Sequence, residues 1–351
     1  MSEPLLAYSG WKIAHHPDVL ADLRAGRLCR PSHLQLHLTA RCNLACRHCI
    51  NGGAIPRVQR PPAAELPTRL ALDVVRDFAD LGGRALEFTG GGEPTMHQEF
   101  FEVVDFALSR DLKVALITNG VMARDKLNDL ATRADRFAWI RVSLDATTVE
   151  DYRRRKGGPD YAFAWATGTI GRLALRGANV GVSYLVDENT TTTEIRDAVE
   201  IARVHGARSI RFAPIYRESL PTSVAGATAA QIAQLALQDF LVVDMLPRRF
   251  ADMAARFEHP DRKCGYLYAS TVVAADGKVY ACCFQAYMKG AELADLSQRT
   301  FAGWWNSKRR ADLLRDWRCA RQCNGIACWM RASNEIFHKL VEEIPSDLDF
   351  I

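Results

Sequence analysis

Short apolar runs alternate with longer amphipathic segments along the first two thirds of the chain. The apolar runs are rich in Val, Ile, Leu and Phe and end in turn or polar residues, as expected of buried parallel strands. They cover residues 33–39, 85–92, 113–120, 139–146, 179–186 and 209–216. In the segments between them, apolar residues recur every three or four positions, which is typical of helices. These predicted helices cover residues 68–82, 97–111, 124–136, 161–177 and 192–206.

Six strand–helix repeats in series predict an α/β fold with a parallel sheet. We expect the sheet to curl into a partial (β/α)6 TIM-like barrel, with an open doubly wound sheet as the alternative. In either arrangement the chemistry lies at the carboxyl ends of the strands.

The pattern changes after residue 217. Residues 226–257 are rich in Ala, Leu and Gln and predict a helix, and residues 304–317 predict another. Residues 270–284 predict two strands joined by Asp276-Gly277, a strong hairpin signal. Cysteines surround this hairpin, so we expect a small cysteine-built domain there. The expected organisation is an N-terminal extension (1–32), a barrel core (33–220), a helical connector (221–257), the cysteine-built domain (258–330), and a C-terminal helix and tail (331–351).

Composition narrows the possible partners. The 351 residues are 48% hydrophobic and carry a net charge of +4, with Lys and Arg spread along the chain. No block of like charge indicates a nucleic-acid or membrane surface. The N-terminus does not resemble a signal peptide, and no run of 18 apolar residues occurs. We therefore expect a cytoplasmic protein that binds neither nucleic acid nor membrane.

Ten cysteines form two groups, with none between Cys49 and Cys264. In a reducing compartment such groups indicate metal binding or catalysis more often than disulfides. Cys42, Cys46 and Cys49 are spaced C-x3-C-x2-C. A structural zinc site needs four ligands, and His48 is awkwardly wedged between two of these cysteines. Three thiolates around a [4Fe–4S] cluster would leave one iron open to a substrate or cosubstrate.

This spacing directly after the first strand resembles the radical S-adenosylmethionine (SAM) superfamily. The resemblance implies that Cys42, Cys46 and Cys49 hold a [4Fe–4S] cluster and that SAM chelates its fourth iron. In the family, the reduced cluster cleaves SAM to a 5′-deoxyadenosyl radical, which takes a hydrogen atom from the substrate. The family usually has an aromatic residue near the adenine just before the third cysteine, where this chain has His48. A zinc or disulfide site is the alternative.

Residues after the later strands match the family in order. Gly91, Gly92 and Glu93 match its GGE motif, whose backbone and carboxylate bind the SAM amino group. Glycine allows close backbone approach, and a carboxylate pairs with an ammonium group. The resemblance also implies cofactor contacts by position at strand ends and in the basic run 153–156, whose alternative is a solvated helix face. These positions are Thr118 and Asn119 after strand three, Ser143 and Asp145 after strand four, Arg155 or Lys156 for the SAM carboxylate, Ser183 and Tyr184 on strand five, and Ile215 near the adenine.

The second cysteine group resembles the SPASM and shorter twitch extensions of the same family. Cys264 and Cys282 bracket the hairpin, with Gly277 in the C-x(n)-G-x4-C pattern. Cys319, Cys323 and Cys328 follow a helix. Five or six ligands suffice for one cube but not two, so we expect a twitch-like domain with one auxiliary [4Fe–4S] cluster, completed by two of the last three cysteines, with Cys323 and Cys328 favoured. A zinc knuckle is the alternative, and Cys283 is expected to be a core thiol on the opposite face of its strand.

The reaction is less well specified. A dehydrogenase can pass one electron to an auxiliary cluster and a proton to a base. An epimerase needs a hydrogen-donating thiol in the barrel, and strands two to six carry no cysteine. We expect oxidation of a secondary alcohol of an aminocyclitol or aminoglycoside intermediate, with Ser183 and Asp145 acting on this amino-sugar substrate.

The alternatives are an epimerase of the same substrates and a peptide-modifying enzyme. Peptide-modifying relatives commonly carry a leader-binding domain, for which the roughly 33 residues before the first strand are too few, so we expect a small molecule. An external reductant such as flavodoxin or ferredoxin is expected to supply electrons.

Overall fold

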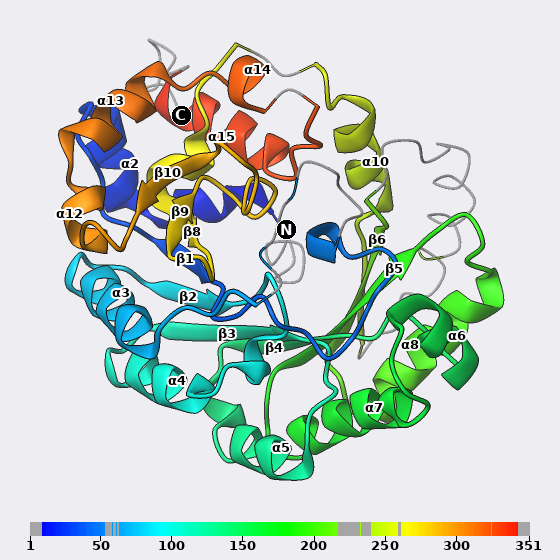
Figure 1. Cartoon of the computed structure of the whole chain (residues 1–351). Coiled ribbons are helices and arrows are strands. Elements are labelled where there is room, and N and C mark those ends of the chain that lie inside the picture. The colour runs from blue at the N-terminus through cyan, green and yellow to red at the C-terminus, as the bar shows by residue number, and fades with distance from the viewer. Residues whose placement is uncertain are drawn as a thin grey trace.

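The computed structural model describes residues 9–52, 58, 61, 63–216, 232, 240–258, 261–323 and 325–342, and every statement below concerns these residues. One curved sheet forms the frame, with helices along its outer side (Figure 1). Its strand order is β10-β9-β8-β1-β2-β3-β4-β5-β6-β7. The edge strands β10 and β7 do not pair with each other in this part of the chain, so the barrel is partial.

The parallel strands confirm the predicted fold class. All six predicted strands form, and their neighbours run parallel. The strands are β1 (His33–Leu36), β2 (Ala85–Phe88), β3 (Lys113–Thr118), β4 (Trp139–Ser143), β5 (Val180–Val186), β6 (Ser209–Pro214), β7 (Leu241–Asp244), β8 (Ser270–Val273), β9 (Lys278–Tyr280) and β10 (Glu292–Asp295).

The five predicted barrel helices also form, as α3, α4, α5, α7 and α8. The helices are α2 (Pro17–Arg24), α3 (Thr68–Asp80), α4 (Phe100–Ser109), α5 (Arg124–Ala131), α6 (Val149–Lys156), α7 (Tyr161–Ala174), α8 (Thr192–Val204), α10 (Leu246–Ala254), α11 (Gly265–Ala269), α12 (Phe301–Trp305), α13 (Lys308–Asp316), α14 (Cys319–Gln322) and α15 (Arg331–Val341). Single 3-10 turns are η1 (Gly10–His15), η2 (Ile50–Gly52), η3 (Pro94–Met96) and η4 (Ala134–Arg136).

The two faces of the sheet differ in chemistry. Outward-facing residues of the strands are apolar and fully buried against the helices; examples are Leu34, Leu36, Leu86, Phe88, Val114, Leu116, Ile140, Val142, Ile210 and Phe212. The alternate, inward-facing positions include Gln35, Glu87, Arg141 and Arg211. Gln35 and Glu87 are register partners, and the Gln35 amide donates to the Glu87 carboxylate at 3.1 Å. The main core therefore lies outside the sheet, and the lumen is polar.

The region predicted as one helix over 226–257 differs from that prediction. Residues 241–244 form β7, a seventh parallel strand paired with β6, and α10 follows. A strand of only four residues, three of them apolar, was too short to recognise beside the Ala-rich stretch. Residues 217–231 and 233–239 lie outside the described part, so the prediction is not assessed there.

The predicted hairpin forms, but its sheet is continuous with the barrel. Gly277 lies at the turn with a φ of 74°, which glycine tolerates. Strand β8 pairs antiparallel with β9 and parallel with β1, with His33 opposite Ser270. The cysteine-built region predicted as a separate domain over 258–330 thus shares the barrel's sheet. The predicted helix over 304–317 is two helices, α12 and α13, because Ser307 caps the start of α13 by accepting a hydrogen bond from the Arg310 N–H.

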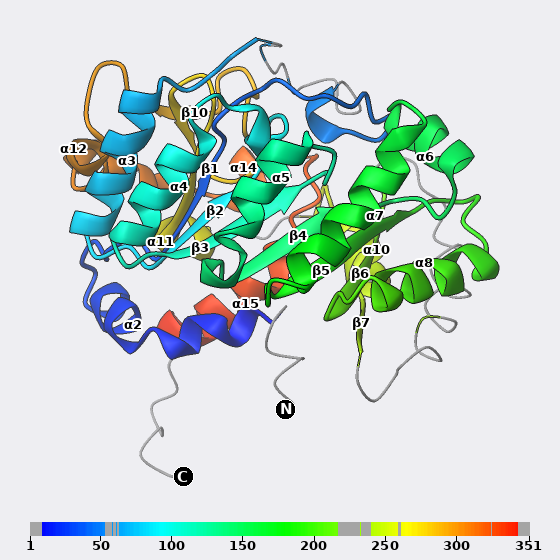
Figure 2. The same cartoon turned by 90° about the horizontal axis from the view of Figure 1, so that it is seen from below.

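The two ends of the described chain meet at one end of the barrel. Figure 2 shows α2 and α15 together there, while the blue segment that follows β1 lies at the other end. Turn η1 packs closely on α15, since a Cβ on Gly10 would lie 2.8 Å from the Ser333 Cα. The predicted N-terminal extension and C-terminal helix therefore form a joint cover.

Arg310 provides a test of how the C-terminal helices are held. Its buried guanidinium donates to the carbonyls of Trp305, Leu267 and Tyr268 at 3.3, 3.4 and 2.8 Å and stacks on the Trp305 ring at 3.5 Å. We expect Arg310→Ala to destabilise the chain by about 3 kcal/mol, because buried carbonyls lose a charged donor. Urea unfolding measures this, with exposed Arg309→Ala as the control. Equal midpoints for the two variants would contradict the expectation.

Candidate active site

The loop after β1 carries Cys42, Cys46 and Cys49 and is held from outside itself. The backbone N–H of Ala45 donates to the Lys156 carbonyl at 2.9 Å, and that of Arg47 donates to the Arg155 carbonyl at 3.0 Å. Both carbonyls lie in the last turn of α6, which ends at Gly157. Helix α6 thus fixes the middle of the cysteine loop through its unpaired C-terminal carbonyls.

The GGE segment fixes the start of the same loop. The Gly92 N–H donates to the Thr39 carbonyl and the Glu93 N–H to the Arg41 carbonyl, each at 2.9 Å. A Cβ built on Gly92 would overlap the Arg41 carbonyl oxygen, and one on Gly91 would overlap the Tyr287 hydroxyl. Close packing therefore favours glycine at both positions, against the backbone of the loop at Gly92 and against the Tyr287 side chain at Gly91.

The Glu93 carboxylate is buried and fully engaged within the chain. One oxygen accepts from the hydroxyls of Thr118 at 2.7 Å and Thr95 at 2.8 Å, and the other accepts from the Asn119 backbone N–H at 2.7 Å. Burial raises the pKa of Glu93, although these donors oppose the shift. The structure uses this carboxylate to join the GGE segment to the end of β3, a role that the sequence did not suggest.

Asn119 lies beside the first cysteine. Its amide nitrogen contacts the Cys42 sulfur at 3.8 Å and donates to the Asn43 side chain at 2.8 Å. The predicted cofactor-site position at the end of β3 therefore adjoins the cysteine loop, although the predicted contact with SAM is untested.

Asp145, Lys156 and His48 form a buried polar cluster. The Lys156 ammonium lies 2.8 Å from Asp145 Oδ2 and from the Ser143 carbonyl, and His48 Nε2 lies 3.5 Å from the same carboxylate oxygen. The other oxygen accepts from the Leu185 N–H at 2.9 Å. Burial alone would raise the pKa of Asp145, but Lys156 and His48 hold it well below its usual range. Both oxygens of Asp145 thus have partners within the chain, which fixes its place in the site; its predicted catalytic role stays a prediction.

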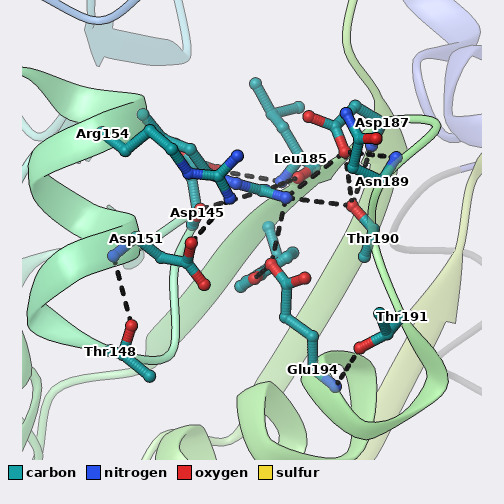
Figure 3. A network of polar contacts seen from close by, with 12 residues as sticks. Asp145, Thr148, Asp151, Arg154, Leu185, Asp187, Asn189, Thr190, Thr191 and Glu194 are labelled. Atoms are coloured by element: carbon teal, nitrogen blue, oxygen red, sulfur yellow. Dashed lines mark hydrogen bonds and ion pairs between the residues drawn. The ribbon is translucent and has the colours of Figure 1, made fainter.

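Arg155 belongs to a polar network whose members Asp187, Thr190 and Glu194 are labelled in Figure 3. It is buried and ion-paired with Asp187 at 3.3 Å and Glu194 at 3.0 Å. It also donates to Thr190 at 3.1 Å and to the Leu185 carbonyl at 3.1 Å. Arg155 thus ties α6 to the loop after β5, and its predicted contact with the SAM carboxylate finds no support in these contacts.

The remaining predicted positions lie on neighbouring strands. Ser143 and Ser183 are register partners, and Ser183 pairs onward with Arg211, so the three side chains share the inner face. Ile215 is buried just after β6, with its N–H bonded to the Val186 carbonyl at 2.9 Å. Their predicted roles toward SAM and substrate remain predictions.

The second cysteine group gathers at one place. A hydrogen bond to Cys319 and burial raise the pKa of Cys264. Cys319 also hydrogen-bonds Cys323, and its pKa is raised to about 12. Burial raises the pKa of Cys282, and the nearby Cys328 and Cys264 add to the shift. All five predicted ligands therefore lie close together, and the geometry does not favour Cys323 and Cys328 over Cys319.

A cavity of about 550 Å³ adjoins these thiols and is lined by Cys319, Cys328 and Asn334 among others. Asn334, on α15, contacts the Cys264 sulfur at 3.8 Å and accepts from the Tyr266 N–H at 3.0 Å. His338 Nε2 lies 3.1 Å from the Lys263 carbonyl. Helix α15 therefore holds the segment that carries Cys264.

Cys283 has different neighbours from the other cysteines. Its pKa is raised to about 11 by burial and by Glu87, while Arg249 opposes the shift. The prediction that Cys283 follows Cys282 on a strand is wrong, because β9 ends at Tyr280 and both cysteines lie in the turn that follows it.

Within the described residues, no three His, Cys, Asp or Glu side chains converge as ligands of a single metal ion. Thiolates that hold an iron–sulfur cube surround it and need not converge on one point. Within the same residues, no helix has both the length and the apolar character needed to cross a membrane.

Comparison with known families shows which protein family the chain matches. Residues 36–203 match the radical SAM superfamily, and residues 264–329 match SPASM, described as an iron–sulfur cluster-binding domain. This chain carries a radical SAM domain and a C-terminal SPASM domain.

Curated relatives of this radical SAM chain match it over part of their length, at about 30% sequence identity. It is 32% identical over 215 residues to mycofactocin maturase MftC of Mycobacterium ulcerans, covering 60% of this chain and 55% of that protein. It is 31% identical over 189 residues to the antilisterial bacteriocin subtilosin biosynthesis protein AlbA of Bacillus subtilis, covering 52% and 39%. The chain thus spans about half the length of the first of these relatives.

Solved structures show the same fold. Streptococcus suis SuiB, solved bound to the precursor peptide SuiA, superimposes with a TM-score of 0.66 over 91% of this chain and 76% of that one. The sequence identity is 12%.

The radical SAM domain implies SAM and a [4Fe–4S] cluster, and the SPASM domain implies an auxiliary iron–sulfur cluster. The residues fit these groups, because three thiols lie on one anchored loop and five more gather beside a cavity. The predicted cofactors are confirmed, and the zinc alternatives lose their support.

Sequence reasoning missed two residues that hold the site. Tyr287, with a φ of 64°, places its hydroxyl against Gly91 and 3.3 Å from His37 Nδ1. Asn334 contacts Cys264 from α15. Both act across large sequence separations, and neither belongs to a local motif, so no pattern in the sequence could have indicated them.

Gly92→Ala tests the packing of the GGE segment. A methyl group there would force the Arg41 carbonyl away, so we expect the variant to lose most of its SAM-site iron. Iron content and SAM binding measure this. Gly168→Ala is the control, because a Cβ there meets no atom within 4 Å. Full iron content and SAM affinity in Gly92→Ala would refute the assignment.

Lys156→Met tests the buried pair. Removing the ammonium leaves the Asp145 charge buried, so we expect a loss of about 3–5 kcal/mol in unfolding free energy. The double variant Lys156→Met/Asp145→Asn should recover much of this loss, because no charge is then left unpaired. Urea unfolding of the unmodified chain, Lys156→Met, Asp145→Asn and the double variant completes a double-mutant cycle. Additive losses of unfolding free energy would contradict the coupling between Lys156 and Asp145.

Proposed function

We propose that this chain is a radical SAM enzyme that modifies a peptide. The observation that carries the proposal is its fold, shared over 91% of the chain with a radical SAM protein solved with a precursor peptide bound. Relatives named as a maturase and as a bacteriocin biosynthesis protein add support. Peptide modification was one of the alternatives predicted from the sequence.

The expected aminocyclitol dehydrogenase finds less support than this alternative. The comparisons support a radical SAM enzyme with an auxiliary cluster, but they do not support dehydrogenation of an amino sugar. The argument from a short N-terminal stretch also carries little weight, because the chain spans only part of its relatives.

The chain's own residues hold and shape the site. When bound, the cluster and SAM supply the radical that takes a hydrogen atom from the substrate. The carbonyls of Arg155 and Lys156 fix the cysteine loop, and Asn119 contacts the Cys42 sulfur. The backbone of Gly92 packs against the start of the cysteine loop at Arg41, and Gly91 packs against the Tyr287 side chain. A reductant such as flavodoxin or ferredoxin is the proposed electron source.

Cofactor content and SAM cleavage test the enzyme class. The reconstituted chain should bind about eight iron ions, four for each of two cubes. With SAM and a chemical reductant it should release 5′-deoxyadenosine, and Cys42→Ala should abolish this release. Cys29→Ala is the matched control, since Cys29 lies in a separate apolar cluster. Undiminished cleavage by Cys42→Ala would disprove the role of the loop.

Substrate class needs a separate assay. The reconstituted enzyme is incubated with SAM, reductant and either synthetic peptides encoded beside its gene or a panel of aminocyclitols. We expect a mass change in a peptide with one 5′-deoxyadenosine per product. Turnover of an aminocyclitol with unchanged peptides would instead restore the dehydrogenase or epimerase reading, distinguished by a mass loss of about two or none.

A further inference from the structure

A second cavity lies inside the barrel at the end opposite the cysteine loop. It has a volume of about 720 Å³ and is lined by residues at the amino ends of the strands, by η1 and by α15. His33, Lys113 and Trp139 begin strands β1, β3 and β4 and line its wall. A space of this size holds a ligand as large as a short peptide.

The charges that line this cavity are mainly positive. Lys12, Arg84 and Lys113 contribute three formal positive charges against one negative charge from Glu87. Arg84 is partly compensated by Asp18, whose carboxylate lies 3.7 Å away. Lys12 and Lys113 still exceed the single carboxylate on the wall, so the cavity favours an anion.

Glu87 does not neutralise these cations. Its carboxylate is committed to the wall, accepting from the Gln35 amide at 3.1 Å and lying 3.7 Å from His33 Nε2. Lys12 and Lys113 line the cavity and are themselves exposed to solvent. Partial desolvation and then the Arg141 guanidinium lower the pKa of Lys12, and Glu87 opposes both. An anion bound beside Lys12 would favour its charged form.

The remaining wall of the cavity is aromatic and suits an apolar group attached to the anion. Trp139 presents an aromatic ring that the Arg141 guanidinium overlies at 4.6 Å, and Tyr266 and Phe337 also line the cavity. An aromatic wall with cations at its rim fits an anionic group attached to an apolar body.

The cavity also lies within reach of the SAM end of the barrel. His33 lines the cavity, and His37, four residues further, contacts the Tyr287 hydroxyl beside Gly91. Four residues of extended strand span about 13 Å. An extended peptide of about four residues covers the same length.

We propose that this cavity binds a carboxylate group of the peptide substrate, through the positive charges of Lys12 and Lys113. The peptide then extends along the polar lumen toward the cysteine loop. The inference rests on the proposed function for the identity of the substrate. The carboxylate comes either from the peptide C-terminus or from an acidic side chain.

Calorimetry with three N-acetylated probe peptides on the reconstituted full chain tests this. The probes are Ala-Ala-Trp-Ala with a free C-terminus, the same peptide as its amide, and Ala-Ala-Trp-Glu as its amide. At least one carboxylate probe should bind about tenfold more tightly than the neutral amide, because a charge-assisted contact is lost in the amide. The free acid or the Glu peptide being tighter identifies the source of the carboxylate.

Charge variants locate the binding. Lys12→Glu and Lys113→Glu should each remove the preference for the carboxylate probe, and Lys339→Glu, an exposed lysine outside the cavity, should preserve it. Glu87→Gln should preserve or increase the preference, because it removes the competing negative charge, whereas a purely structural loss would weaken all probes equally.

Several outcomes would overturn the inference. These are equal binding of all three probes, no binding of either carboxylate probe, or an unchanged preference in both lysine variants. Binding is measured without turnover, so it is separate from the proposed function. A carboxylate preference without any peptide modification would support this cavity and contradict the proposed function, and modification of peptides without the preference would do the reverse.

Discussion

The cysteine loop after β1 has little regular structure of its own, and its shape depends on backbone hydrogen bonds to distant segments. The end of α6 provides two carbonyls for Ala45 and Arg47, and the GGE segment donates two N–H groups to the carbonyls of Thr39 and Arg41. Buried backbone groups must be paired, so these bonds set where the three thiols can lie. The polar clusters around Asp145 and Arg155 then hold α6 itself, because each connects that helix to the strand ends. The chemistry of the loop is thus supported by residues that need not touch a cofactor.

The sheet supplies the second constraint. Since β8 pairs with β1, the SPASM segment continues the barrel sheet and is not a separate domain on a linker. Tyr287, in the same segment, contacts Gly91 of the GGE segment. The apolar core lies between the sheet and the outer helices, which leaves the lumen free to be polar. Gln35, Glu87 and Arg141 can face inward there without costing the fold its core. A lumen of this kind suits a substrate with several polar groups, as a peptide has.

Local patterns predicted what local forces determine. Six strands, five barrel helices, the hairpin at Gly277 and both cysteine groups could be recognised because each shows in neighbouring residues. From the sequence, α6 was recognised only as a basic run. Its buried cations Arg155 and Lys156 give it the charged composition that is typical of a solvated helix. The β8–β1 pairing, Tyr287 and Asn334 were missed because contacts between distant segments leave no periodic signal. The roles given to Asp145 and Arg155 stay predictions: a charge at a strand end can serve either a ligand or its neighbours, and the contacts within the chain show only the neighbours.

The meeting of the two chain ends has a consequence for how the protein is made. His33 on β1 bonds to Ser270 on β8, which is synthesised 237 residues later. Asn334 contacts Cys264 only once α15 has packed against the segment that carries Cys264. At about 5–20 residues per second, roughly ten to fifty seconds of synthesis separate the two strands. The first cysteine loop therefore emerges long before the last helix that closes the second site. Among the described residues, the second cysteine site can therefore be completed only after the barrel strands and the first cysteine loop have been synthesised.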